Sequence, residues 1–162
     1  MSRSTGSGQH ILPITLTVTV PLGPAAAFSL FADGLGGWWP REYTWGQEVL
    51  EWIGIEPGEG GRCTERGPGG FECDWGQVRS WEPPTRLELS WQISPRREPV
   101  PDPAQASRVT VGFAAEGGGT AVTLTHGEFE RHGDGAAEYR DALASREGWP
   151  FILGRYVAAA GK

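Results

Sequence analysis

Lysine is almost absent from this chain of 162 residues, and positive charge of any kind is sparse. The 14 basic residues include a single lysine, Lys162, and they stand against 20 acidic residues, so the formal net charge is −6 at pH 7. The arginines are scattered along the sequence and form no basic stripe. Because nucleic acids and anionic membrane surfaces are bound through clustered positive charge, neither is an expected partner.

Long apolar runs are also missing. The sequence has no stretch of about 18 apolar residues, so no transmembrane helix is predicted. The opening MSRSTGSGQH (1–10) lacks the apolar segment of a secretory signal and has the small polar residues of a flexible tail. We therefore expect a cytoplasmic protein with a tail over 1–10 and a single domain over 11–162.

Cysteine is limited to Cys63 and Cys73. In a cytoplasmic protein, two cysteines are expected to stay reduced. One alternative depends on the turn between them. If GPGG (67–70) turns so that residue 66 pairs with residue 70, Cys63 faces Cys73 and a cross-strand disulfide stays open.

The familiar catalytic and cofactor motifs are missing as well. The sequence contains no GxSxG, no GxGxxG after a predicted strand and no GxxxxGK[ST], and neither cysteine has a histidine at a suggestive spacing. The three histidines show no metal-ligand spacing. We therefore assign no catalytic residue, no metal and no cofactor, and the sequence favours a protein that is not an enzyme.

What the chain does have is regular alternation. Leu87, Leu89, Trp91 and Ile93 alternate with polar residues, as in a strand with one buried face. Similar patterns predict strands over 14–20, 49–57, 59–67, 71–84, 85–93, 107–116 and 119–129, and helices over 24–33, 136–147 and 148–160. A long antiparallel sheet buries its apolar face by curling around the final amphipathic helix, so the predicted class is α+β.

Tryptophan is abundant, with eight in the chain. Period two places Trp91 on the inward face of its strand and puts Trp75 on the same face as Phe71 and Cys73. Such rings either fill the core or line a cavity. An indole N–H without a protein partner would favour the cavity.

Among the polar residues, His126 is in phase with Val122 and Leu124, so we expect it to point inward. A hydrogen-bonded structural role is the first interpretation, with ligand binding and proton transfer as alternatives. His132 is expected in a solvated loop. The acidic residues expected mostly on solvated strand faces are Glu72, Asp74, Glu82 and Glu88.

Several phrases follow one another in an order that resembles the START-like superfamily. They are GWWP (37–40), GQVRSWEPPTRLELSWQI (76–93), GGTAVTLTHGEFE (118–130) and GWPFILGRYV (148–157). More narrowly, the chain is similar to proteins related to the C-terminal domain of the activator of the ninety-kilodalton heat-shock protein ATPase, also labelled polyketide-cyclase-like. The resemblance implies a helix-grip fold, in which a curved antiparallel sheet of about six to seven strands wraps around a long C-terminal helix and encloses a cavity.

The resemblance also leads us to expect a small hydrophobic or aromatic ligand between the sheet and the last helix. The residues expected to contact it are Trp39, Tyr43, Trp75, Gln77, Trp91, His126, Phe129 and Trp149. Two other functions stay open: a protein-interaction module with a chaperone partner, and an aromatase or cyclase. In the last case the residues that would place protons are Gln77, Arg79, Tyr43 or His126. A homodimer also stays open.

The segment GWWPREYTWG (37–46) is expected to close one end of this cavity. Adjacent side chains in an irregular segment point in different directions, so one of Trp38 and Trp39 should fill the core while the other reaches the cavity or solvent. We assign Trp39 to the cavity and Tyr43 and Trp45 to its rim, with Pro40 directing the exit of the chain.

Overall fold

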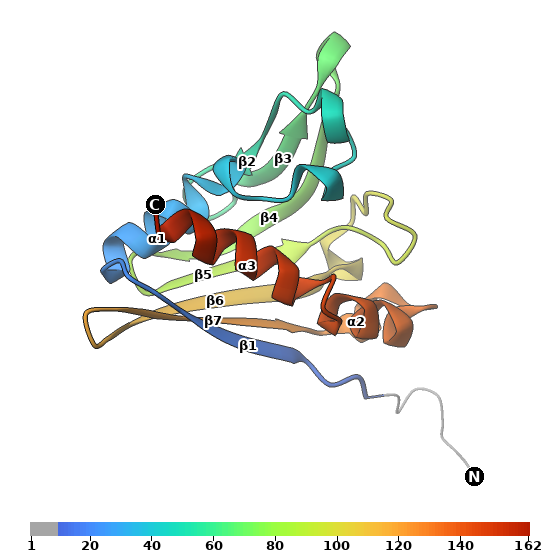
Figure 1. The fold of residues 1–162 in the computed structure, drawn as a ribbon. Coiled ribbons are helices and arrows are strands. Elements are labelled where there is room, and N and C mark those ends of the chain that lie inside the picture. The colour runs from blue at the N-terminus through green and yellow to red at the C-terminus, as the bar shows by residue number, and fades with distance from the viewer. Residues whose placement is uncertain (1–9) are drawn as a thin grey trace.

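The computed structural model describes residues 10–162. Of the tail predicted over 1–10, residues 1–9 therefore lie outside the described residues. Over 10–162 the chain forms a seven-stranded antiparallel sheet that curls around its last helix (Figure 1). The predicted α+β helix-grip fold is confirmed.

The strands follow the order β1-β7-β6-β5-β4-β3-β2 across the sheet. Their bounds are β1 (Ile14–Val20), β2 (Trp52–Ile55), β3 (Arg62–Arg66), β4 (Glu72–Glu82), β5 (Arg86–Trp91), β6 (Ser107–Glu116) and β7 (Gly119–Gly127). The α-helices are α1 (Pro24–Ala32), α2 (Ala136–Ala144) and α3 (Trp149–Ala160). Short 3-10 helices that matter below are η2 (Leu35–Gly37), η3 (Arg41–Tyr43), η4 (Gln47–Val49) and η7 (Phe129–His132).

Alternation in the sequence accounts for the strands. In β1 the end residues Ile14 and Val20 are buried, while the threonines between them are exposed. In β5 Leu87, Leu89 and Trp91 are all buried. Because successive side chains of a strand point to opposite faces, these residues form one apolar face of the sheet, which must be buried against another element.

The C-terminal part consists of two helices in sequence, as predicted, with a sharp break between them. An added Cβ at Gly148 would lie 2.2 Å from the carbonyl oxygen of Leu143, so glycine permits this close turn. The hydroxyl of Tyr156 donates to the carbonyl oxygen of Ala27 at 2.8 Å and ties α3 to α1. No helix among residues 10–162 is long and apolar enough to cross a membrane.

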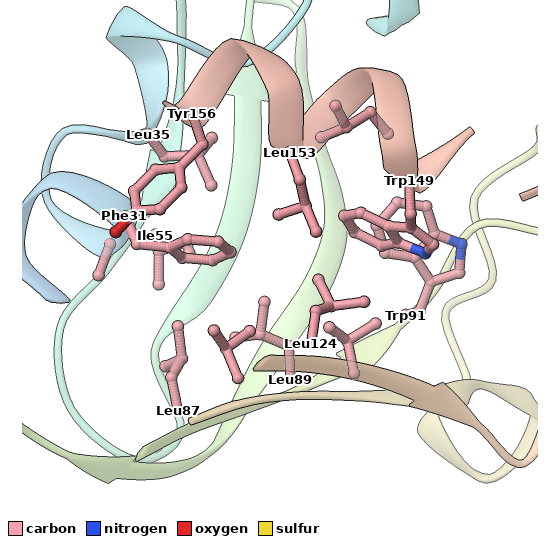
Figure 2. Packing of buried hydrophobic residues seen from close by; sticks show 14 of the residues in the cluster. Phe31, Leu35, Ile55, Leu87, Leu89, Trp91, Leu124, Trp149, Leu153 and Tyr156 are labelled. Carbon is pink, nitrogen blue, oxygen red and sulfur yellow. The ribbon is translucent and has the colours of Figure 1, made fainter. Parts of the chain in front are cut away.

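The core lies between α3 and the concave face of the sheet. Figure 2 shows Leu153 of α3 pointing toward Leu89 and Leu124, and Trp149 lying beside Trp91. All five side chains are buried. Trp149 at the start of α3 and Trp91 at the end of β5 form one pair of packed aromatic side chains, and Phe31 and Tyr156 form another.

The two cysteines do not face each other. Arg66 pairs with Glu72, because the turn between β3 and β4 is wider than the expected hairpin and contains two glycines with positive φ. A bulge after Cys63 then places that residue opposite Gly76, whereas Cys73 lies opposite Glu65. Both thiols are free, so the disulfide that the sequence left open is absent.

Candidate functional site

A cavity of about 530 Å³ opens between the sheet, the start of α3 and the segment that links η2 to β2. Its wall is largely aromatic and aliphatic, with four charged side chains. The aromatic and aliphatic lining residues include Trp39, Tyr43, Trp45, Trp75, Trp91, Ile53, Ile93, Leu143 and Ile152, and the charged ones are Glu42, Glu65, Arg97 and Glu147. This volume is in the usual range for a small-molecule site, roughly 300–1,000 Å³.

Three tryptophans form the aromatic wall. Trp39 is stacked on Trp75, with ring centroids 5.7 Å apart and planes inclined by 23°. Trp91 contacts both rings, at 6.3 Å from Trp39 and 6.1 Å from Trp75. The neighbouring Trp38 is buried in the core, where its Nε1–H donates to the carbonyl oxygen of Leu30 at 3.0 Å. The adjacent pair therefore divides between core and cavity, with Trp39 on the cavity side as predicted.

The indole N–H groups differ in one telling respect. Trp91 Nε1–H donates to the Tyr139 hydroxyl at 2.8 Å, and Trp45 Nε1–H donates to the carbonyl oxygen of Arg97 at 2.7 Å. Trp149 Nε1–H also has an acceptor, on His126. Trp75 is only 3% exposed, yet its Nε1–H finds no acceptor among residues 10–162. A buried donor without a protein partner on a cavity wall is a group that a bound molecule can satisfy.

Glu65 is the polar residue of the site that the sequence interpretation missed. It is 2% exposed, and its two carboxylate oxygens accept the backbone N–H groups of Trp45 and Gly46 at 3.0 and 2.9 Å. Glu65 lies two residues after Cys63, so period two places both on one face. Cysteine is among the residue types most often buried, so Cys63, which the structure buries, was the available indication in the sequence that Glu65 also points inward.

The segment predicted to close the cavity crosses its mouth and is bonded on both sides. The Tyr43 hydroxyl donates to the carbonyl oxygen of Glu147, between α2 and α3, at 2.7 Å. On the other side, the bond from Trp45 reaches Arg97, which follows β5. Both residues lie at the rim, and Tyr43 is 43% exposed. These two bonds connect the covering segment to both walls.

His126 lies behind this wall in a chain of hydrogen bonds. Because an indole N–H only donates, His126 Nδ1 is the acceptor of the 2.9 Å bond from Trp149, and its proton is on Nε2. His126 Nε2–H then donates to Ser107 Oγ at 2.7 Å, and the Ser107 hydroxyl donates to His132 Nε2 at 2.7 Å. The bond from Trp149 fixes both directions at His126, and the direction from Ser107 to His132 corresponds to the His132 tautomer with its proton on Nδ1, which has no partner among residues 10–162.

Burial keeps both histidines of this hydrogen-bonded series, His126 and His132, neutral. It holds the pKa of His126 well below its usual value, with a smaller contribution from His132, and it lowers the pKa of His132 to about 4. The expectation that His132 is solvated is therefore wrong. It lies in η7 against Ser107, because the turn after β7 folds back over the start of β6.

The structure brings half of the expected ligand residues to the cavity wall. Trp39, Tyr43, Trp75 and Trp91 line it. Trp149, His126 and Phe129 form a buried aromatic layer behind that wall, with Trp149 6.0 Å from Trp39 and Phe129 stacked on His126 at 4.2 Å. Gln77 lies apart, where its side-chain oxygen accepts from the exposed Arg79. Contact of any of these eight residues with a ligand stays a prediction.

Few of the residues that the sequence suggested for proton transfer reach this site. Of the four residues considered for proton placement, only Tyr43 lines the cavity. Both nitrogens of His126 are engaged within the fold. In the part of the chain that the structure describes, no group of three or more His, Cys, Asp or Glu side chains could hold a metal ion.

Comparison with known proteins places this geometry in a family. The family model described as "Activator of Hsp90 ATPase homolog 1-like protein" matches residues 31–160. A search of the curated proteins finds no match. Among solved structures, the anthrahydroquino-γ-pyrone synthase Txn09 is 32% identical, with a TM-score of 0.65 over 92% of this chain and 97% of that chain.

Two other solved structures extend the comparison. The self-sacrificing resistance protein CalC from Micromonospora echinospora is 26% identical, with a TM-score of 0.62 over 91% of this chain and 93% of that chain. The Aha1 dimer from Colwellia psychrerythraea shares the fold at 16% identity and a TM-score of 0.60, over 93% of this chain and 96% of that chain. With the family model covering most of its length, the chain belongs to the family of Activator of Hsp90 ATPase homolog 1-like proteins, within the START-like helix-grip superfamily.

Proposed function

We propose that the protein binds a small, largely aromatic molecule in the cavity beneath the segment 37–46. The observation that carries this proposal is the indole wall of Trp39, Trp75 and Trp91 around about 530 Å³. Aromatic side chains favour aromatic ligands, because stacked and edge-to-face ring pairs contribute about 0.5–1.5 kcal/mol beyond the burial of area. The unpartnered N–H of Trp75 supplies a polar group that would orient such a ligand.

The comparisons support the same ligand class. Txn09, 32% identical to this chain, is named as a synthase of an anthrahydroquino-γ-pyrone. That product name describes fused rings. A cavity with three indoles in contact fits flat polycyclic molecules of this kind better than flexible aliphatic chains, since planar rings stack without losing internal freedom.

Mass spectrometry and calorimetry test this proposal. Native mass spectrometry of protein purified from its own host should reveal a co-purifying small molecule, and calorimetric titration should show binding of polycyclic aromatic compounds. Trp39→Ala should weaken that binding about tenfold to a hundredfold through the lost ring contacts. Trp52→Ala is the matched control, because Trp52 is 40% exposed on the edge strand β2 and outside the cavity. Equal affinities for the two variants would refute the proposed site.

A catalytic role is a second candidate, and it is favoured by the synthase name of Txn09. In this chain Tyr43 and Glu65 are cavity residues with a hydroxyl and a carboxylate that can exchange protons with a bound substrate. Incubation with a poly-β-keto substrate and product analysis by mass spectrometry tests it. An unchanged substrate would remove this candidate and leave the binding proposal intact.

A protein partner is the third candidate, in line with the family name. Trp52 and Phe71 are large apolar side chains that are 40% and 43% exposed near the β2 edge of the sheet. Pull-down with an Hsp90-type chaperone and size-exclusion chromatography at increasing concentration would detect a chaperone complex or a homodimer. Trp52→Glu should abolish either association if this edge is the contact.

A further inference from the structure

Glu65 is a buried carboxylate that forms no ion pair with any of residues 10–162. Its side chain is 2% exposed, and no arginine, lysine or histidine among residues 10–162 forms an ion pair with it. A carboxylate offers roughly four acceptor positions, and the N–H groups of Trp45 and Gly46 occupy two of them. Because a buried charge is costly unless it is paired, the remaining positions favour a donor or a cation.

The other charges of the cavity reinforce this preference. Its lining contains three glutamates and one arginine. Glu42 is paired at the rim with Arg155 at 2.9 Å. The guanidinium of Arg97 lies over the ring of Tyr139, 5.3 Å from its centroid. Glu65 is thus the innermost charge, and solvent screens it less than the charges at the rim.

The negative charge of Glu65 also affects a thiol on the neighbouring strand. Cys73 is its register partner on β4. Burial, followed by the charge of Glu65, raises the pKa of the Cys73 thiol. The carboxylate therefore creates a local field that disfavours a second anion.

The indole wall has the same electrostatic preference. The faces of Trp39, Trp75 and Trp91 carry partial negative charge, and a cation within about 6 Å of an indole centroid is attracted by it. Trp75 adds an independent observation, since its side chain lines the same cavity and its buried N–H lacks an acceptor among residues 10–162. That N–H requires an oxygen or another acceptor on the ligand.

We propose that the cavity selects aromatic molecules that carry a protonated amine, with the amine on Glu65 and an acceptor atom of the ligand on the Trp75 N–H. This inference rests on the proposed function and assigns the chemical class of the ligand. The ammonium group donates hydrogen bonds to the acceptor positions of Glu65 that the protein leaves open, while the rings of the ligand pack against Trp39, Trp75 and Trp91. An aromatic anion of the same size would meet the uncompensated charge of Glu65 and bind more weakly.

Three probes with one ring system, whose ring carbonyls give each of them an acceptor for the Trp75 N–H, test this selectivity: 2-(aminomethyl)anthraquinone as the cation, 2-(hydroxymethyl)anthraquinone as the neutral molecule and anthraquinone-2-carboxylate as the anion. Calorimetric titration of the wild-type protein at pH 7 should give at least about tenfold tighter binding of the amine than of the alcohol, because hydrogen bonds to charged groups are the stronger ones. The carboxylate should bind weakest. The preference should persist in high salt, since Glu65 is buried.

A charge-removing variant then assigns the preference to one residue. Glu65→Gln should reduce the ratio of amine to alcohol affinity to about twofold, whereas Glu48→Gln should leave it unchanged. Glu48 is the matched control because it removes the same charge from the exposed η4, outside the cavity. Glu65→Gln also disturbs the bonds to Trp45 and Gly46, so its melting temperature is measured first. If the variant does not fold, the wild-type order of the three probes decides.

The outcomes separate this inference from the proposed function. Binding of all three probes with equal affinity, or tightest binding of the carboxylate, would overturn the amine selectivity and leave aromatic binding standing. A folded Glu65→Gln protein that keeps the full preference would overturn the role of Glu65. No binding of any probe would overturn both.

Discussion

Replacing Ser107 with alanine removes the central link of the chain that runs from Trp149 to His132. Ser107 is fully buried, and its hydroxyl accepts from His126 Nε2–H and donates to His132 Nε2, both at 2.7 Å. Alanine fits the same space and makes neither bond. The substitution therefore leaves one buried donor and one half-buried acceptor without partners, while it creates almost no cavity.

The magnitude follows from those two groups. Leaving a buried polar group unsatisfied costs about 1–3 kcal/mol. His126 is 0% exposed and cannot reach water, so its cost lies toward the upper end, whereas half-buried His132 can turn toward solvent and lies toward the lower end. We expect Ser107→Ala to lower the free energy of unfolding by about 2–4 kcal/mol. For a chain of this size the corresponding fall in melting temperature is about 5–15 °C.

Urea unfolding followed by far-UV circular dichroism measures this change. Ser29→Ala is the matched control, because Ser29 is exposed on α1 and bonds only to Asp33, so its loss should change stability by less than about 0.5 kcal/mol. If the two variants have the same unfolding midpoint, the hydrogen bonds of Ser107 contribute nothing to stability and the predicted cost is refuted.

Three further predictions concern pH, backbone space and thiol reactivity. The two histidines bonded to Ser107 have a lower pKa in the folded than in the unfolded chain, so the unfolded chain binds more protons between about pH 4 and 6.5. The contribution of these histidines to the free energy of unfolding should therefore be fully present above pH 6.5. It should fall as the pH drops, by up to about 1.4 kcal/mol per pH unit for each histidine. Equal urea midpoints at pH 7 and pH 5 would contradict this. Gly76→Ala would place Cβ 2.4 Å from a carbonyl oxygen of β5, so it should lower the free energy of unfolding by more than about 2 kcal/mol, as calorimetry can measure. Gly154→Ala on α3 is the control, because nothing lies within 4 Å of its added Cβ, and it should leave stability unchanged or raise it. A thiol reagent should modify the half-buried Cys73 in the native protein but Cys63 only after unfolding. Cys63 is 0% exposed, and burial raises the pKa of its thiol. Labelling of both cysteines at the same rate in the native state would contradict the observed packing of β3.

Much of the fold follows from local patterns. The period-two alternation of β5, with Leu87, Leu89 and Trp91 inward, depends only on the geometry of a strand, and the structure has the same three residues buried. The strand limits depend on pairing instead. The run predicted over 59–67 shortens to β3 (Arg62–Arg66), because the residues before it form the turn that connects β2 to β3.

Local side-chain periodicity also made part of the site predictable. The phase of β7 places His126 inward, and the irregular segment at Trp38 and Trp39 requires that the two rings separate. The partners of His126 could not be predicted, since Ser107 lies 19 residues and Trp149 23 residues away. Such contacts depend on how β6, β7 and α3 come together.

The sequence by itself determined the α+β class, the inward faces of the strands and the supply of aromatic rings, because side-chain periodicity and composition are local properties. Only the tertiary structure decided that Trp39, Trp75 and Trp91 share one wall and that the two cysteines do not face each other. It also decided that Glu65 lines the same cavity without an ion pair to any of residues 10–162. The physical reason is register. A one-residue shift between strands, or a bulge such as the one after Cys63, changes which side chains meet without changing the pattern of either strand.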